Sequence, residues 1–383
     1  MSLFSKKEAY LGIDLGSGGM KLVELHKTKG RAQLWTYGIL DEELDLHVER
    51  RAGEPVGVSQ AAGASGEKKG EAPAKPEDPR VLRYGGLLKE LLASARVTTN
   101  RATASLPVSQ IFHSVLTIPF IEAKKRDMMV KAEIEKLLPR PIEEMQVVHQ
   151  EMPHEQGEEN PSAGAQGKVK RYLRFLVTAA PKDLVSFYTA IFQKAGLQLE
   201  ELETEAFALE RSLVGRDPAV VMVVDIGSTR TNFFIMDSGL PATHRSIQIG
   251  GRDINLKLER LLGIPRENAE QAKRDFSRVN AKELPTAPFA SVFDPIIKEI
   301  EYGFSVYMRQ LGSENKRPEK IILTGGSAVF PPLVRRIEES FDARVFVGDP
   351  WARVVYQQGL KPTLDEIGPR MAVSIGLALR NIV

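Results

Sequence analysis

The sequence predicts an α/β protein built from two domains that face one cleft. One pattern occurs twice, at residues 10–25 and 220–237: an apolar run, Asp-x-Gly-Ser, a short turn and a second apolar run. The aspartates of the two copies, Asp14 and Asp225, lie 211 positions apart (225 − 14), so each half of the chain carries its own strand–turn–strand hairpin. A third element, residues 320–339, has the order strand, Gly-Gly turn and helix. Together the three elements predict two domains with a shared ligand site.

The turns of the two hairpins have the chemistry of an anion site. Glycine permits a positive φ and leaves no Cβ where a ligand must approach the backbone. Successive backbone N–H groups in such a turn hold anions, and neighbouring hydroxyl groups and a lysine add donors and positive charge. The sequence therefore predicts phosphate binding by Gly16, Ser17, Gly18, Gly19 and Lys21 in the first hairpin and by Gly227, Ser228 and Thr229 in the second.

The two aspartates would repel a phosphate group directly. Their position is explained if a hydrated Mg²⁺ lies between carboxylates and phosphates, because magnesium usually keeps several waters and few protein carboxylates. One such hairpin alone is weak support, since Asp-x-Gly is common in β-turns. Two copies and the later Gly-Gly turn predict a clamp for ATP and Mg²⁺, with Asp14 and Asp225 as metal ligands through water.

These segments resemble the superfamily of actin, sugar kinases and heat-shock-70 proteins. Residues 14–21, DLGSGGMK, are similar to actin's first phosphate loop, and residues 322–337 resemble its adenosine loop and following helix. Residues 268–277 resemble the heat-shock-70 segment whose Glu and Lys flank the adenine and ribose, and residues 250–258 resemble the strand-to-helix connection of the second half. The resemblance implies nucleotide contacts from Gly251, Glu270, Lys273, Gly325, Gly326 and Ser327. It also implies catalytic roles for Asp14, Asp225 and Glu203, the last matching a heat-shock-70 Glu near the γ-phosphate.

Within the superfamily the chain resembles the PilM family, FtsA-like proteins of type IV pilus machines. The likeness covers nearly the whole chain, from the first hairpin through residues 133–145, 177–197 and 205–213 to the ending GLALRNIV at 376–383. It implies an actin-like two-domain fold, also called ribonuclease H-like, with the FtsA-type insert known as subdomain 1C.

Composition and resemblance together predict a division of the chain. Two polar stretches lack the large apolar side chains of a core, and we interpret them as a flexible insertion at about 45–80 and a hairpin loop at 154–170. The expected parts are subdomain 1A at 1–103, subdomain 1C at 104–182, a return to 1A at 183–219, domain 2 at 220–350 with its subdomain 2B at about 252–312, and a last return to 1A at 351–383.

Three helices are predicted from apolar residues at helical spacing. The first, at 122–138, ends at Pro139 and presents Val130, Ile134, Leu137 and Leu138. The second, at 182–195, ends at Gly196 and presents Leu184, Tyr188, Ile191, Phe192 and Ala195. We expect these two helices and at least three strands to form the insert, and the helix at 291–311 to be part of the core beside the adenosine strand.

Composition excludes several kinds of site. The chain of 383 residues has no cysteine, which excludes disulfides and thiolate metal sites, and its six histidines show no paired spacing. A net charge of +2 is too balanced to favour nucleic acid as a partner. No apolar stretch approaches the roughly 20 residues of a membrane-spanning helix, and the N-terminus does not read as a signal peptide. We therefore expect a cytoplasmic protein.

Three functions remain open. In the first, ATP is a structural ligand that closes the two domains and shapes a partner-binding surface, as the PilM resemblance implies. In the second, the chain is a small-molecule kinase, which requires a substrate pocket and a carboxylate base. In the third, it forms FtsA-like filaments. The type II secretion counterpart of the pilus scaffold is a further alternative, because the two share fold and nucleotide site.

The PilM resemblance also implies a partner and a location. In that family the N-terminal cytoplasmic tail of PilN, a single-pass inner-membrane protein, lies in a groove between subdomains 1A and 1C. The chain would then lie at the inner membrane through a PilN-like partner, with pilus motor ATPases and self-association as further contacts. We expect at most slow ATPase activity.

Overall fold

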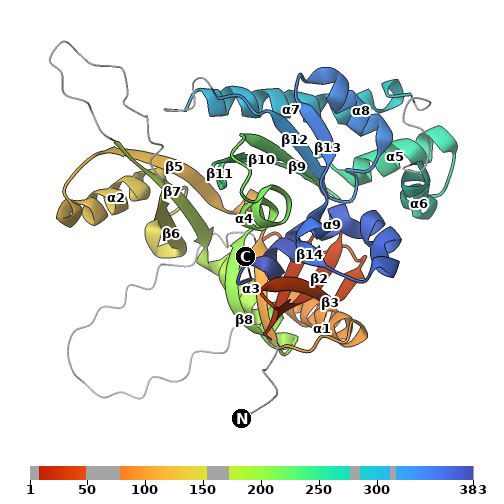
Figure 1. Ribbon diagram of the computed structural model, residues 1–383, viewed down its shortest axis with the longest axis horizontal. Helices are drawn as coiled ribbons and strands as arrows, with labels where there is room; N and C mark the ends of the chain where they lie inside the picture. The colour runs from red at the N-terminus through yellow and green to blue at the C-terminus, as the bar shows by residue number, and fades with distance from the viewer. Residues whose placement is uncertain (1–7, 49–77, 153–171, 277–284, 311–315, 383) are drawn as a thin grey trace.

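Three β-sheets organise the chain in the computed structural model (Figure 1), which describes residues 8–48, 78–152, 172–276, 285–310 and 316–382. The first sheet has the order β14 (Val354–Val355), β3 (Arg31–Leu40), β2 (Gly19–Thr28), β1 (Ala9–Gly16), β4 (Arg101–Leu106) and β8 (Gln198–Thr204). The second has the order β11 (Leu240–Ile247), β10 (Thr231–Asp237), β9 (Val221–Ile226), β12 (Lys320–Thr324) and β13 (Arg344–Val347). The third and smallest consists of β5 (Phe112–Pro119), β7 (Tyr172–Pro181) and β6 (Met145–Glu151).

The two larger sheets repeat one topology. In each, three antiparallel strands follow one another, and later strands join in parallel beside the first of the three. β1 lies between β2 and β4 in the first sheet, as β9 lies between β10 and β12 in the second. The duplicated halves predicted from the two hairpins are therefore present, and each hairpin turn starts at the carboxyl end of a central strand.

Helices cover the faces of both large sheets. On the first sheet, α1 (Pro79–Ser94) and α3 (Lys182–Lys194) pack on one face, and α9 (Lys361–Leu379) packs on the other. On the second sheet, α7 (Ala290–Met308) and α8 (Pro331–Ser340) share a core with alternate residues of β9. Val221 and Val223, on the other face of β9, pack with α4 (Glu205–Leu209) and α9 in the core of the first sheet. α4 and α9 therefore connect the two domains.

Close backbone contacts fix α9 in this position. A Cβ on Gly12 of β1 would lie 2.1 Å from the carbonyl oxygen of Ser374. A Cβ on Gly376 would lie 1.8 Å from the carbonyl oxygen of Ala208 in α4. Near the middle of α9, the Pro369 carbonyl accepts a hydrogen bond from the backbone N–H of Gly325, which follows β12, at 2.9 Å. At these positions the backbone of α9 directly contacts the backbone of both domains.

The small sheet and α2 (Ala123–Leu137) form an insert that lies to one side of the first domain (Figure 1). Val130 and Ile134 of α2 are buried on the sheet, as the helical spacing predicts, but Leu137 at the end of the helix is exposed. The interpretation of helical spacing that put α3 in the insert is wrong, whereas the predicted division had assigned residues 183–219 to the first domain. The apolar face of α3 packs on α1 and the first sheet, because Phe187, Ile191 and their neighbours extend the core of that domain.

Some predictions concern residues outside the described ranges. The loop predicted at 154–170 lies wholly outside them, and so does most of the insertion predicted at about 45–80. The predicted domain boundaries remain a proposal, and β4 extends three residues into the segment assigned to the insert (104–106). Among the helices of the described ranges, none combines the length and the apolar character that crossing a membrane requires.

Two adjacent glycines in α1 test the packing of α1 on α3. A Cβ on Gly85 would lie 2.5 Å from Cβ of Lys194 in α3, whereas a Cβ on Gly86 would meet no atom within 4 Å. Gly85→Ala should lower the free energy of unfolding by about 1–3 kcal/mol through overpacking. Gly86→Ala should raise it by about 0.5–1 kcal/mol, because alanine favours the helix over glycine. Urea unfolding of the two variants measures both effects, and equal shifts would contradict this packing.

Candidate functional site

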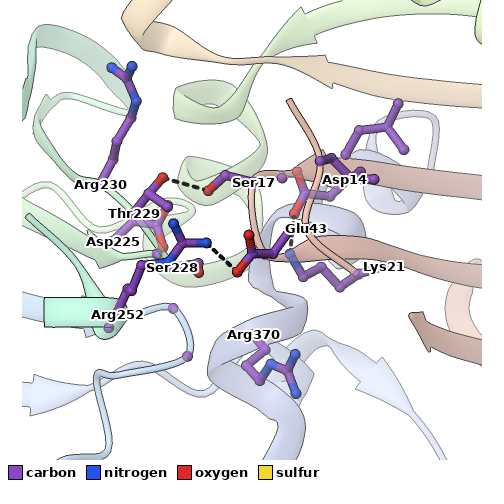
Figure 2. A pocket seen from close by; sticks show the side chains of 18 of the residues that line it. Asp14, Ser17, Lys21, Glu43, Asp225, Ser228, Thr229, Arg230, Arg252 and Arg370 are labelled. Atoms are coloured by element: carbon purple, nitrogen blue, oxygen red, sulfur yellow. Dashed lines mark hydrogen bonds and ion pairs between the residues drawn. The ribbon is translucent and has the colours of Figure 1, made fainter. Parts of the chain in front are cut away.

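A cleft of about 920 Å³ lies between the two domains. Its walls are the two hairpin turns, α5 (Gly251–Leu262), α6 (Arg266–Phe276), the Gly-Gly turn after β12 and the segment 41–47 after β3. Figure 2 shows Ser17 and Lys21 of the first hairpin lining the same pocket as Ser228 and Thr229 of the second. Of the site residues predicted from the sequence, those on the cleft are Asp14, Gly16, Ser17, Gly18, Lys21, Asp225, Gly227, Ser228, Thr229, Gly251, Glu270, Lys273, Gly325, Gly326 and Ser327.

In the first hairpin, strand register brings the charged residues together. Asp14 lies opposite Lys21 in the β1–β2 pair, and Lys21 Nζ is 3.6 Å from Asp14 Oδ2. Opposed side chains on one face of an antiparallel pair are close enough to interact. Ser105 of the adjacent strand β4 donates a hydrogen bond to Asp14 Oδ1 at 3.1 Å. Asp14 is therefore held from both neighbouring strands.

Gly19 does not line the cleft, contrary to its predicted role in phosphate binding. It begins β2 with a φ of 127°, and a Cβ there would lie 1.9 Å from the carbonyl oxygen of Leu40. A side chain at this position would collide with the segment that follows β3. Gly19 is thus required for packing behind the turn.

The second hairpin repeats the register with a different partner. Asp225 lies opposite Asn232 in the β9–β10 pair, as Asp14 lies opposite Lys21. Both pairs are separated by seven positions (21 − 14 and 232 − 225). Asn232 therefore occupies the position that corresponds to Lys21. The sequence analysis missed Asn232, although the equal spacing after each aspartate was a signal for it.

The two hairpin turns touch each other across the cleft. The Ser17 Oγ and Thr229 Oγ1 atoms are hydrogen bonded at 2.8 Å. A Cβ on Gly18 would lie 2.7 Å from the Cβ of Ser228. In the Gly-Gly turn, Gly325 has a φ of 88°, and a Cβ there would lie 2.6 Å from Asp225 Oδ1. The absence of side chains at these glycines lets three turns converge on the end of β9.

A third acidic residue, Glu205, lies at this point of convergence. It is the first residue of α4, it lines the cleft, and its Oε2 accepts hydrogen bonds from the Val108 backbone at 3.2 Å and from Asn232 Nδ2 at 3.3 Å. Burial raises the pKa of Glu205 well above its ordinary value, and the charges of Asp225 and Asp14 raise it further. The sequence analysis missed Glu205, because long-range pairing of β8 with β4 brings it here.

Glu203, predicted to act near the γ-phosphate, does not line the cleft. It is buried on β8 and forms ion pairs with Arg211 and with Arg380. Burial lowers the pKa of Arg211 to about 10, and the charge of Arg380 lowers it as well. The chain turns into α4 just after Glu203, so that Glu205 faces the cleft while Glu203 binds the end of α9. Its role in this structure is a buried ionic contact.

Burial and the nearby charge of Asp14 raise the pKa of Asp225 to about 6, against the opposing effects of Lys21 and the hydrogen bond from Asn232. The described residues contain no cluster of three or more His, Cys, Asp or Glu side chains arranged to hold a metal ion by themselves. Carboxylate oxygens are nevertheless the ligands that Mg²⁺ prefers. A cation between Asp14 and Asp225 would remove the repulsion that disfavours their ionised forms.

The part of the cleft wall formed by α5 and α6 is polar. Lys273 of α6 is 4% exposed, and its Nζ donates to Glu270 Oε2 at 2.6 Å. Asn255 of α5 donates to the same oxygen at 2.9 Å, while its own Oδ1 is buried without a partner among the described residues. A Cβ on Gly251 would lie 2.4 Å from Ser327 Oγ and 3.0 Å from Lys273 Nζ. This wall therefore offers both donors and an unpaired acceptor to a polar ligand.

Comparison with known proteins identifies relatives of this arrangement. The family model described as type IV pilus assembly protein PilM matches residues 85–382. The cell division protein FtsA of Pseudomonas aeruginosa is 25% identical over 181 residues, which cover 42% of this chain and 43% of FtsA. FtsA of Borreliella burgdorferi is 23% identical over 208 residues, 49% of each protein. The matches thus span less than half the length of these relatives.

Solved structures with a similar fold cover almost the whole chain. A PilM–PilN type IV pilus biogenesis complex has a TM-score of 0.73 and 21% identity and covers 98% of both chains. The ethanolamine utilization protein EutJ from Carboxydothermus hydrogenoformans has a TM-score of 0.52 and 17% identity, over 97% of this chain and 89% of its own. At these identities the likeness concerns the fold. The fold is the actin-like two-domain fold that the sequence predicts.

Replacing Asp225 by Asn should stabilise the magnesium-free protein at neutral pH. The folded-state pKa of about 6 lies above the ordinary value of 3.8. Ionising this carboxyl therefore opposes folding, by an amount that grows as the pH rises from about 4 to about 6 and is constant above that. We expect Asp225→Asn to be about 1–3 kcal/mol more stable than wild type near pH 7.5 and nearly equal to it near pH 4.

Urea unfolding in the presence of EDTA measures this difference across the pH range. Asp294→Asn is the control, because Asp294 is an exposed partner of Arg336. A loss of stability for Asp225→Asn near pH 7.5 would contradict the proposed crowding of carboxylates.

Proposed function

The chain belongs to the PilM family of type IV pilus assembly proteins, and we propose that it acts there as a scaffold that binds ATP with Mg²⁺. The observation that carries this proposal is the contact of the two hairpin turns at Ser17 and Thr229, with Asp14 and Asp225 beside them. Turns of this kind present backbone N–H groups to phosphate. Two of them on opposite domains would make phosphate binding depend on the relative position of the domains.

The residues present fit a magnesium nucleotide. Ser17, Ser228, Thr229 and the glycine turns would hold the phosphates, and Lys21 would contribute positive charge. Mg²⁺, when bound, would supply the charge that lets phosphates and the carboxylates of Asp14 and Asp225 share one site. On the wall formed by α5 and α6, Glu270, Lys273 and the unpaired Oδ1 of Asn255 would contact the nucleoside.

We infer that hydrolysis is at most slow. Glu205 is the acidic group best placed to orient a water molecule, since it lines the cleft beside Asp14 and Asp225. Burial and the charges of Asp225 and Asp14 raise its pKa and so favour the protonated carboxyl, which cannot accept a proton from water. A nucleotide that is held and slowly cleaved suits a scaffold that changes shape with its ligand.

A second cavity supports the proposal of a peptide partner. It has a volume of about 300 Å³ and lies where the insert meets the first domain, lined by His47, Val48, Ser109, Gln110, Ile111, Phe112, Pro139, Arg140, Met145, Pro181, Asp183 and Leu184. We propose that the N-terminal tail of a PilN-like membrane protein binds here as an extended segment, through main-chain pairing and pocketed side chains. This would place the protein at the inner membrane.

The peptide site and the nucleotide site have residues in common. His47, Ser109 and Gln110 line both cavities. Gln110 also hydrogen bonds the backbone of Leu46 and of Val48, at 2.9 and 3.0 Å. A change in the nucleotide cleft on ligand binding would therefore shift one wall of the peptide groove. A coupling of this kind is reciprocal, so the peptide should also change nucleotide affinity.

Asp225→Ala should weaken binding of Mg²⁺–ATP at least tenfold while changing the affinity for metal-free ATP much less, because the carboxylate acts through the cation. Isothermal titration calorimetry with and without EDTA measures both affinities. Asp294→Ala, on the outer surface of the second domain, serves as the control. Equal losses in the two conditions would argue against a metal-mediated role, and absence of nucleotide binding by the wild type would refute the proposed site.

Two arginines of the insert provide a matched test of the peptide groove. Arg140 lines the groove and pairs with Asp183 at 3.2 Å, whereas Arg126 pairs with Glu151 at 3.0 Å and does not line it. Arg140→Glu should weaken binding of the N-terminal peptide from the PilN homologue of the same genome about tenfold or more, and Arg126→Glu should not. Fluorescence anisotropy gives the affinities, with Mg²⁺–ATP binding as the check on folding. Equal effects would place the docking surface elsewhere.

A further inference from the structure

An acidic segment crosses the mouth of the cleft directly after β3. Residues 41–46 have the sequence DEELDL. Leu44 and Leu46 are buried in the core of the first domain, and the Leu44 backbone N–H donates to the Ser17 carbonyl at 3.2 Å. The hydroxyl of Tyr84 in α1 accepts a hydrogen bond from the backbone N–H of Asp45 at 2.8 Å. The segment is thus fixed to the first domain, against the first phosphate turn.

Two of its carboxylates reach the other wall of the cleft. Glu43 forms ion pairs with Arg252 of α5 and with Arg266 of α6, the second at 3.5 Å. Figure 2 shows the pair of Glu43 and Arg252 in front of the hairpin turns. Asp41 lies 3.6 Å from Arg274 of α6 and also pairs with Arg370 of α9. These four arginines line the cleft together with Asp41 and Glu43.

The other two carboxylates of the segment stay within the first domain. Glu42 pairs with Arg83 and Asp45 pairs with Arg80, both on α1. The four acidic residues therefore divide into a pair that bridges the two domains and a pair that does not. Charge and sequence position are closely matched between these pairs, which makes the second pair an internal control.

We propose that Asp41 and Glu43 of this segment form an acidic latch, which holds the ligand-free cleft closed and occupies cleft arginines until an anionic ligand displaces it. The latch carboxylates and the ligand phosphates compete for the same positive side chains. Access of nucleotide would then require release of Asp41 and Glu43. This inference goes beyond the proposed function and rests on it only in naming a nucleotide as the displacing ligand.

The exposure of these ion pairs determines how strongly the latch favours the closed state. The side chain of Glu43 is 67% exposed and that of Asp41 is 54% exposed, while Arg370 is 19% exposed. Exposed ion pairs contribute little individually and are screened by salt. Loss of several such pairs together should raise the population of the open state about five- to tenfold at low ionic strength.

The chain has no cysteine, so labels can be attached at two introduced cysteines without background. Lys89→Cys on α1 and Arg260→Cys on α5 place one spin label on each domain, at exposed positions. Distance distributions would be measured without nucleotide for three proteins with this background. These are the labelled parent, the Asp41→Asn and Glu43→Gln double variant, and the Glu42→Gln and Asp45→Asn double variant.

For the labelled parent we expect a narrow distribution of short distances between the two spin labels at low salt. In about 1 M salt this distribution should broaden to longer distances. The Asp41→Asn and Glu43→Gln protein should populate the longer distances already at low salt, and the Glu42→Gln and Asp45→Asn protein should behave as the parent. An unchanged distribution in the first variant, or equal opening in both, would overturn the proposal.

The second readout is the rate at which a fluorescently labelled ATP analogue binds, measured by stopped flow. The bridging variant should bind it about five- to tenfold faster than the control variant at low salt. If the distances change as expected and no protein binds the analogue, the latch stands and the proposed nucleotide is wrong. If all proteins bind it at one rate, displacement of the latch by nucleotide is refuted.

Discussion

The contact between the two hairpin turns is the constraint on which the rest of the structure depends. Ser17 and Thr229 come from domains whose central strands run in equivalent positions of two sheets, and their hydroxyl groups are hydrogen bonded at 2.8 Å. The glycine-mediated approach of α9 to β1 and α4 sets the two sheets at the spacing that permits this contact. If the phosphate-binding turns lay on one domain alone, binding of an anion would not affect the relative position of the two domains. Here any ligand between the turns must act on both domains.

This convergence has an electrostatic consequence. Asp14, Asp225 and Glu205 are forced together at the ends of three strands, and burial with mutual repulsion raises the pKa values of Asp225 and Glu205. Ionising these carboxyl groups together is therefore unfavourable, and the magnesium nucleotide that we propose would reduce their repulsion. The acidic latch adds negative charge at the mouth of the cleft, on arginines that the ligand would otherwise meet first. Affinity and closure would thus be controlled by the same charges.

The parts of the site that depend on local pattern could be predicted from the sequence, because the register of a hairpin fixes which residues face each other. Asp14 and Lys21 follow from this rule, and Asn232 could have followed from the same spacing. Glu205 could not, because its position depends on parallel pairing of strands separated by almost 100 residues, β4 and β8. Helical spacing likewise identified the apolar face of α3 without indicating that this face packs on α1 and the first sheet. The domain division and the nucleotide contacts remain proposals.

We propose that a magnesium nucleotide binds between the two turns and separates their contact. Because the chain lacks cysteine, a protein with Ser17→Cys and Thr229→Cys tests this directly through the rate at which the two residues form a disulfide under mild oxidation. We expect rapid cross-linking of the ligand-free protein and strong slowing by Mg²⁺–ATP, with no slowing by Mg²⁺ alone. Failure of the empty protein to cross-link, or a rate that Mg²⁺–ATP leaves unchanged, would contradict it.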